Sequence, residues 1–190
     1  MKMMEERILK DGHIGAGNVL KVDRFLNHQV DVPFLYEATK EFYEKFKDAG
    51  VNKILTIEAS GIGVAALTAM HFGCPLVFAK KTVTNNIFGD VYRSQVYSYT
   101  HERTYEIIVS KEFLSKDDRI LVVDDFLAKG SALRALLELI GASGATCVGA
   151  GIAIEKAFQP GGKELREAGL QIESLARIKS MTEEEGIAFC

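Results

Sequence analysis

Apolar side chains recur every four residues from Phe34 to Phe46, a spacing that places them on one face of a helix. Pro33 suits the first turn of such a helix, because a backbone N–H at that position has no partner within the helix. Gly50 follows the last apolar position and is typical of a helix end. The pattern therefore predicts a helix that starts near residue 33 and ends before residue 50.

Two later stretches each combine an apolar run, a helical run and a second apolar run. Each is expected to form a strand, a helix and a second strand, an arrangement that places the two strands in parallel. The expected boundaries are 53–59, 60–73 and 75–80 for the first unit, and 119–126, 131–144 and 146–156 for the second. A last helix over 161–169 and a strand over 171–178 are expected to finish the sheet.

The chain between these two units has a different pattern. Residues 81–90 are polar and turn-prone, whereas 91–100 and 104–110 alternate polar and apolar side chains. The alternation predicts an antiparallel hairpin, or a mobile ribbon, set on the parallel core. No repeat or linker divides the chain, so the sequence indicates one α/β domain over 1–190 with an N-terminal appendage of about 30 residues.

Composition narrows the functional classes. The chain has 190 residues, 47% of them hydrophobic, which excludes disorder throughout and allows a core without disulfides or metals. A net charge of −3 and the lack of a basic stripe argue against nucleic-acid binding. No apolar run is long enough to cross a membrane, and no signal peptide is present. Cys74, Cys147 and Cys190 lie far apart, which fits reduced thiols in the cytoplasm and no zinc site.

The stretch Ile120–Ala132, ILVVDDFLAKGSA, carries the clearest chemistry. An apolar strand ends in Asp124 and Asp125, and a short loop then opens a helix. Helix N-termini attract phosphate, Gly130 lets backbone approach closely, and Ser131 adds a hydroxyl donor. Carboxylates just upstream would repel phosphate, so they make sense only if they face sugar hydroxyls or a metal. The pattern favours a phosphorylated sugar as ligand.

The same residues also have an ordinary structural interpretation. Asp124 and Asp125 could form a solvated strand end, with Ser131 as the helix N-cap. Two other phosphate motifs are excluded: a Walker A loop is absent, and GHIGAG (12–17) has the wrong glycine spacing for a dinucleotide site and follows no strand. A response-regulator receiver would need its acid pair near the first strand and a phosphoacceptor Asp at the end of a later one, which the sequence lacks.

The stretch Ile120–Ala132 resembles the 5-phosphoribosyl-1-diphosphate (PRPP) signature of type I phosphoribosyltransferases. The resemblance extends to purine-specific members of this family, in particular those that act on xanthine, through residues 19–31, 56–63, 151–165 and 173–178. It implies the type I phosphoribosyltransferase fold: an α/β domain whose central, mostly parallel sheet is flanked by helices, with a small N-terminal/C-terminal hood and an antiparallel flexible hairpin. Residues 1–32 would contribute to the hood over the base.

The resemblance also implies a set of site residues. Asp124 and Asp125 would be catalytic and face the ribose hydroxyls. The other implied residues are Ala128, Lys129, Gly130, Ser131 and Ala132 for PRPP; Glu58, Ala59, Ser60, Gly61 and Lys81 for the diphosphate; and Leu20, Asn27, Lys156 and Phe158 for xanthine.

From the residues alone, several of these positions have plain alternatives. Ser60 could cap a helix, Lys81 could be a solvated lysine, Lys156 could belong to an exposed charged pair with Glu155, and Phe158 could pack in the core.

The implied reaction is transfer of a 5-phosphoribosyl group from PRPP to N9 of xanthine. Mg²⁺ would be held mainly by PRPP, with no dedicated metal site in the protein, and the chain would form a homodimer without nucleic-acid or membrane partners. Two alternatives stay open. One is a phosphoribosyltransferase for guanine or hypoxanthine, and the other is a non-catalytic regulator of the same fold that binds PRPP.

Overall fold

A computed structural model describes residues 1–15, 17–81, 89–98 and 103–190. A central sheet of six strands has the order β10-β9-β8-β7-β3-β4. Its strands are β3 (Lys53–Ile57), β4 (Leu76–Ala79), β7 (Arg119–Leu127), β8 (Thr146–Lys156), β9 (Ile172–Thr182) and β10 (Gly186–Phe189). The contacts β3–β4, β3–β7, β7–β8 and β8–β9 are parallel. Both predicted strand–helix–strand units are therefore confirmed.

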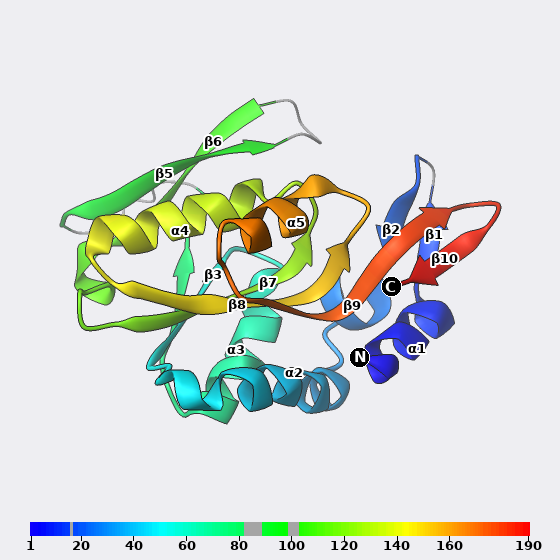
Figure 1. Cartoon of the computed structure of the whole chain (residues 1–190), viewed down its shortest axis with the longest axis horizontal. Helices are drawn as coiled ribbons and strands as arrows, with labels where there is room; N and C mark the ends of the chain where they lie inside the picture. The colour runs from blue at the N-terminus through cyan, green and yellow to red at the C-terminus, as the bar shows by residue number, and fades with distance from the viewer. Residues whose placement is uncertain (16, 82–88, 99–102) are drawn as a thin grey trace.

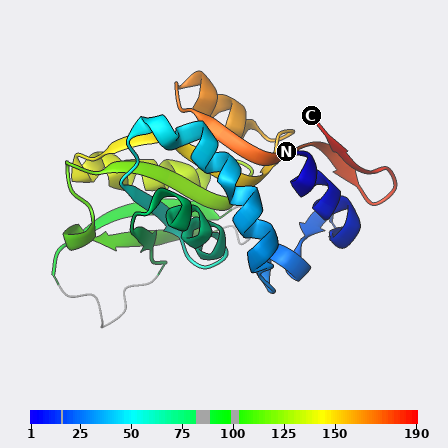
Figure 2. The same ribbon diagram turned by 90° about the horizontal axis from the view of Figure 1, so that it is seen from below.

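Helices cover both faces of this sheet (Figure 1). The helices are α1 (Lys2–Asp11), α2 (Val32–Phe46), α3 (Gly61–Phe72), α4 (Ser131–Ser143) and α5 (Pro160–Glu167), with short 3-10 turns at Lys47–Ala49 and Lys111–Phe113. Buried apolar residues of α2 and α3 form one core cluster, and those of α4 and α5 form a second one. Figure 2 shows α2 and α3 together along one side of the strands.

The helix predicted from the four-residue spacing is α2. Its Phe42 and Phe46 are fully buried, and both pack closely against glycines of β8. A Cβ added at Gly151 would come within 3.0 Å of the Phe42 ring. These glycines thus let a large aromatic surface reach the sheet, where burial of each ring contributes about 1.5–3 kcal/mol.

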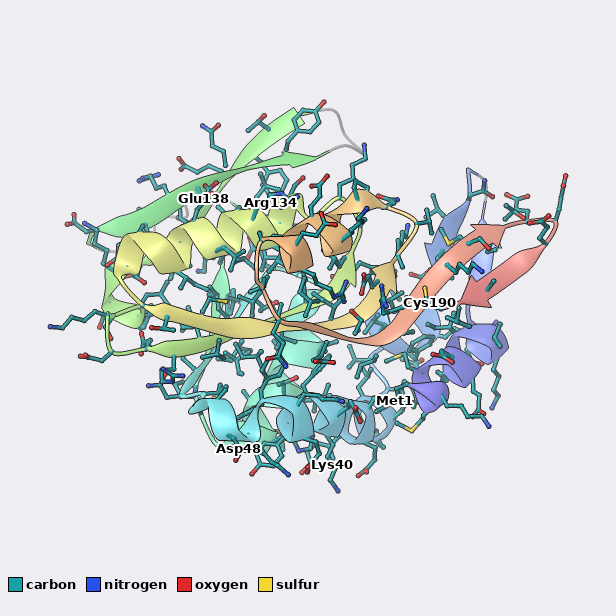
Figure 3. All side chains as sticks on the ribbon, viewed as in Figure 1. Met1, Lys40, Asp48, Arg134, Glu138 and Cys190 are labelled. Atoms are coloured by element: carbon teal, nitrogen blue, oxygen red, sulfur yellow. The ribbon has the colours of Figure 1, made fainter. Side chains whose placement is uncertain are left out.

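The predicted antiparallel hairpin is also present. Strands β5 (Val91–Ser98) and β6 (Arg103–Ser110) pair from Val91↔Ser110 to Ser98↔Arg103 and lie over α4. Figure 3 labels Glu138 on α4, and the Ser94 hydroxyl of β5 donates to its carboxylate at 2.6 Å. The connecting turn at 99–102 and most of the turn-prone segment 81–90 lie outside the described residues, so the expected mobility of this ribbon stays a prediction.

The N-terminal segment contains elements that the sequence did not predict. After α1 come a small antiparallel hairpin, β1 (His13–Gly15) and β2 (Val19–Lys21), and a π-helical turn, η1 (Asp23–Asn27). The Arg7 guanidinium lies over the rings of Phe25 and Phe34, and its Nη2 contacts Asp31 Oδ2 at 2.8 Å. Because Asp31 also caps α2 through the Phe34 N–H, Arg7 fastens the N-terminal segment to the start of α2.

One expectation about the sheet is wrong. The strand predicted over 171–178 does not finish the sheet, because β9 continues to Thr182 and β10 adds an antiparallel edge strand. The β9–β10 hairpin lies close to the N-terminal segment (Figures 1 and 2). The Met1 amino group donates to the Leu175 carbonyl oxygen of β9. The start of the chain is thus held against β9, and the role of this region as a hood over a base stays a prediction.

Candidate active site

The loop between β7 and α4 has the geometry of an anion cradle. Gly130 occupies the N-cap position of α4 with φ at +82°, a left-handed conformation that glycine adopts without strain. Ser131 is the first helical residue, so the alternative that Ser131 is the N-cap is wrong. The first N–H groups of a helix have no partners within it and carry the positive end of its dipole. The loop can therefore bind a phosphate.

The start of helix α5 packs against this loop, a contact that the sequence did not predict. The Gly161 N–H donates to the Ala128 carbonyl oxygen at 3.2 Å. A Cβ at Gly161 would come within 2.6 Å of the Gly130 nitrogen, so only glycine fits there. The signal that could have revealed the contact was the Gly-Gly pair after Pro160, because paired glycines early in a helix are otherwise unfavourable.

The two acids at the end of β7 differ in their surroundings. Asp124 is 5% exposed, and its Oδ1 accepts the Asp125 N–H at 3.0 Å. Burial, and then the nearby Asp125 charge, raise the pKa of Asp124 well above its ordinary value. Asp125 is half-buried, and its own Oδ1 accepts the Phe126 N–H. The alternative of a solvated strand end is wrong for Asp124.

The predicted diphosphate loop lies directly against Asp124. A Cβ at Gly61 would lie 2.8 Å from Asp124 Oδ1 and would collide with the Thr56 hydroxyl oxygen. Ser60 stands at the N-cap of α3 without a side-chain capping hydrogen bond, so its hydroxyl is not used in that way. The Glu58–Ala59 peptide is cis. This loop and the acid pair therefore form one continuous strand-end surface.

Lys81 joins the same cluster. Its backbone N–H donates to Glu58 Oε1 at 2.7 Å, and its ammonium lies 5.5 Å from the centre of the Tyr105 ring. The charge of Lys81 partly opposes the upward shift in the pKa of Asp124. The hydrogen bond to Glu58 holds the backbone of Lys81 in place. Its side chain is exposed, so the ammonium can reach an anion bound nearby.

The loop at 128–132, which we call the phosphate loop, and Lys156 both line a cavity of about 390 Å³. Its walls include all of Ala128–Ala132, with Phe126 and Tyr105 beside them. The Lys156 ammonium lies 5.8 Å from the centre of the Phe126 ring, and burial lowers the pKa of this lysine. The cavity is thus lined both by the first residues of α4 and by a partly desolvated cation.

The residues at the end of β8 differ in their exposure. Glu155 is 1% exposed and Lys156 is half-buried, so they are not an exposed charged pair. Phe158 is 48% exposed, so it is not a core residue and its ring is open to a ligand. Sequence reasoning missed the partners of Glu155, which are Arg166, Ser174 and Arg177.

The hood residues occupy two different environments. Leu20 is 5% exposed and packs in the core cluster of α2 and α3, whereas Asn27 is exposed at the end of η1. Neither is among the described residues that line the 390 Å³ cavity. Val30, just after η1, would touch a Cβ at Gly63 at 3.5 Å, which brings the hood close to the diphosphate loop. Contact of Leu20 and Asn27 with a base stays a prediction.

Within the described part of the chain, no helix has the length and apolarity needed to cross a membrane. In the same residues, His, Cys, Asp and Glu side chains form no group of three or more suited to a metal ion.

Comparisons with known proteins identify the family of this chain. A family model described as phosphoribosyl transferase domain matches residues 33–169. Xanthine phosphoribosyltransferases of Finegoldia magna and Lachnoclostridium phytofermentans are 51% and 52% identical, covering 98% of this chain and 98% and 96% of theirs. The structure of an APRTase from Giardia lamblia with 9-deazaadenine has a TM-score of 0.78 at 20% identity, over 92% of this chain and 97% of that one. The fold is that of the type I phosphoribosyltransferases, and the chain belongs to the phosphoribosyltransferase family.

Proposed function

We propose that this chain transfers the 5-phosphoribosyl group of PRPP to N9 of xanthine, which yields xanthosine 5'-monophosphate and diphosphate in purine salvage. The observation that carries the proposal is the 390 Å³ cavity, which the phosphate loop and Lys156 both line. The choice of xanthine is supported by relatives that carry this activity in their names and are about half identical over nearly the whole chain.

The phosphoribosyl half of the substrate would occupy the end of β7. Residues 128–132 would bind the 5-phosphate through backbone N–H groups and the Ser131 hydroxyl. Asp124 and Asp125 would be the catalytic residues, accepting hydrogen bonds from the ribose hydroxyls and so positioning the ribose. The loop 58–61 and Lys81 would bind the diphosphate, and the Lys81 ammonium would oppose repulsion between its negative charge and the nearby Asp124.

The purine half would lie beside the end of β8. The Lys156 ammonium would donate to the 6-oxo group and N7, and the exposed Phe158 ring offers a surface for stacking. Asn27 has an amide that can donate to the 2-oxo group, which distinguishes xanthine from hypoxanthine. Leu20, which belongs to the hood, would supply apolar contact with the base.

The reaction forms the bond between C1 and N9 and breaks the bond between C1 and the diphosphate oxygen, which leaves with the electron pair. N9 gives up its proton to solvent. Positive charge develops on the ribose and negative charge on the diphosphate, so catalysis is mainly positioning and charge stabilisation. The protein needs no covalent nucleophile for this step.

Mg²⁺ would enter with PRPP. This ion prefers oxygen ligands, keeps several waters and binds proteins through one or two carboxylates plus substrate phosphates. Asp124 and Asp125 are adjacent carboxylates that fit this limited role. When bound, the ion would neutralise charge on the departing diphosphate. A homodimer and a cytoplasmic location complete the proposal, the latter supported by three free cysteines among the described residues.

Residues 1–190 would work as one phosphoribosyltransferase domain in which 1–32 contributes to the hood. Support comes from the core cluster that joins buried residues of α1 and η1 to those of α2 and α3. Guanine and hypoxanthine are the second candidate bases, since both share the 6-oxo group that Lys156 would contact.

Nucleotide formation from PRPP and Mg²⁺ with xanthine, guanine, hypoxanthine and adenine, assayed side by side, tests the choice of base. We expect the highest kcat/KM for xanthine and the lowest for adenine, which lacks the 6-oxo group. A preference for hypoxanthine over xanthine would contradict the assignment.

A further inference from the structure

Glu155 is a buried carboxylate for which the proposed reaction has no direct use. It is the last residue but one of β8 and is only 1% exposed. Arg166 of α5 binds it in a bidentate way, Nη1 to Oε1 at 2.7 Å and Nη2 to Oε2 at 2.8 Å. The Ser174 hydroxyl of β9 donates to Oε2 at 2.6 Å. The carboxylate therefore joins three elements.

Arg177 completes the group, with its Nε 3.2 Å from Glu155 Oε2. We call Glu155, Arg166, Ser174 and Arg177 the Glu155 clamp. Burial alone would raise the pKa of Glu155, but the hydrogen bonds from Arg166 and Ser174 and the charges of both arginines outweigh burial and lower it. Glu155 is consequently ionised at neutral pH, and the clamp is a charged network.

The clamp fixes the residue next to Lys156. Successive side chains of a strand point to opposite faces, so Glu155 faces away from the side on which Lys156 projects. In the sheet, Glu155 pairs with Arg177 on one side and with Leu127 on the other, directly before the phosphate loop. The position of Lys156 relative to that loop therefore depends on how firmly Glu155 is held.

Helix α5 touches both halves of the proposed site through adjacent glycines. A Cβ at Gly161 would collide with the backbone of the phosphate loop, and a Cβ at Gly162 would collide with Glu155 Oε1. Arg166 lies one turn further along the same helix and reaches back to Glu155. The N-terminal half of α5 thus contacts the phosphate loop and the purine-side strand end at once.

A gain in folding stability does not explain the Glu155 clamp well. A buried ion pair is often no more stabilising than well-packed apolar residues of the same volume, because both charges lose their hydration. What a bidentate, fully hydrogen-bonded carboxylate supplies is a fixed geometry. The clamp also lies outside the residues that the proposed function assigns to substrate.

We propose that Glu155, acting through Arg166, is a positioning residue that holds Lys156 against the purine at a fixed distance from the phosphate loop. This inference rests on the proposed role of Lys156. A displaced Lys156 would weaken contact with the base while the phosphate loop, built from its own backbone, would bind PRPP as before.

The test is a double-mutant cycle on KM for the purine and for PRPP, in Mg²⁺ buffer with the full chain. Glu155→Gln keeps the shape and removes the charge, and we expect it to raise KM for xanthine about 10-fold, since a displacement of about 1 Å at a reacting group can cost more than that. KM for PRPP should stay within about twofold. Adding Glu155→Gln to Lys156→Ala should change KM for xanthine by less than about twofold, because the positioned group is already gone.

Arg134→Gln is the matched control. Arg134 of α4 pairs with Glu164 of α5 through side chains that are 40% and 55% exposed, so its loss disturbs the same helix without touching the clamp. We expect both KM values of this variant to match those of the wild type. If Glu155→Gln does not fold, Arg166→Lys, which keeps the charge but loses the bidentate contact, replaces it in the cycle.

Several results would overturn the inference. Parallel rises in both KM values, or additive effects in the double variant, would show that the clamp only stabilises the fold. An unchanged KM for xanthine in folded Glu155→Gln would exclude positioning. If Lys156→Ala itself leaves KM for xanthine unchanged, the proposed function of Lys156 fails first and the inference falls with it, a result distinct from failure of Glu155 alone.

Discussion

Asp124 and Glu155 are both buried carboxylates at the ends of neighbouring strands, yet the protein treats them in opposite ways. Asp124 lies beside another acid, and burial with that neighbour raises its pKa. Glu155 is bound by two arginines, which overcome the effect of burial and lower its pKa. The difference shows that partners decide whether a buried acid keeps its charge. It also distinguishes the end of β7, where no cation among the described residues pairs closely with Asp124, from the end of β8, where Glu155 already has its hydrogen-bond partners.

The same contrast holds for the two halves of the site. The phosphoribosyl side is built mostly from residues 124–132, one turn of backbone with a glycine at its corner. The proposed purine side would combine η1, the end of β8 and the clamp, which are far apart in the sequence. Changes on the first side should affect catalysis as a whole, whereas changes on the second should affect the choice and binding of the base.

The largest effect is expected when both acids of the proposed phosphoribosyl side are replaced by amides. Asp124→Asn with Asp125→Asn removes both carboxyl acceptors for the ribose hydroxyls, a loss of about 3 kcal/mol or more in all, so kcat should fall about 100-fold or more. Circular dichroism should show an intact fold. Xanthine turnover at the wild-type rate by this variant would disprove the assignment of the acid pair.

On the purine side, Lys156→Ala should lower kcat/KM for xanthine about 10- to 150-fold through the loss of a charge-assisted hydrogen bond. KM for PRPP should change far less, because Lys156 lies on β8 and is not part of the phosphate loop at 128–132. Steady-state kinetics with each substrate varied in turn measure the difference. An effect confined to PRPP would remove Lys156 from the base site.

Asn27→Leu probes the hood. Without the amide, the 2-oxo group of xanthine loses its donor, and kcat/KM for xanthine should fall about 10-fold, which corresponds to about 1.4 kcal/mol. Hypoxanthine has no 2-oxo group and should suffer less. An unchanged ratio of the two kcat/KM values would mean that Asn27 has only a structural role.

The smallest expected effects are changes of some degrees in Tm when a carboxylate is replaced by its amide. These changes should be opposite in sign at Asp124 and Glu155. The folded-state pKa of Asp124 lies above the unfolded value, so stability falls as pH rises from about 4 through the folded pKa. Asp124→Asn removes this loss and should raise Tm at pH 7, with an advantage that disappears below about pH 4.

Glu155 has a lowered folded-state pKa, so its contribution to stability is present above its unfolded pKa of about 4.3 and is lost as pH falls through the folded pKa. Glu155→Gln should therefore lower Tm at pH 7. A cost of about 2–3 kcal/mol is expected, below the usual range for a broken buried pair because the Arg166 side chain is 29% exposed. Thermal unfolding scans across pH check both variants, and shifts of the same sign would contradict the comparison.

Local sequence pattern predicted most of the fold. Periodic apolar positions identified α2, both strand–helix–strand units and the β5–β6 hairpin, because each has a regular hydrophobic face. Helix α1 was missed although Met4 and Ile8 are four residues apart and fully buried, since charged residues surround them. Strand β10 was missed because an edge strand of four residues carries little pattern.

The site divides in the same way. The phosphate loop follows a contiguous motif, so its residues could be predicted together. The arginines that bind Glu155 could not be predicted, because nothing in the sequence near residue 155 indicates which distant cations return to it. The close fit of Gly161 against the loop likewise depends on how α5 docks, which is a property of the tertiary structure.

The most direct test of the central claim is the amount of diphosphate released from PRPP and Mg²⁺ by the wild-type protein, with and without xanthine. The account predicts release that depends on xanthine and equals, mole for mole, the xanthosine 5'-monophosphate formed. PRPP binding without release of diphosphate in the presence of any purine would instead indicate a regulator of the same fold and would contradict the proposed function.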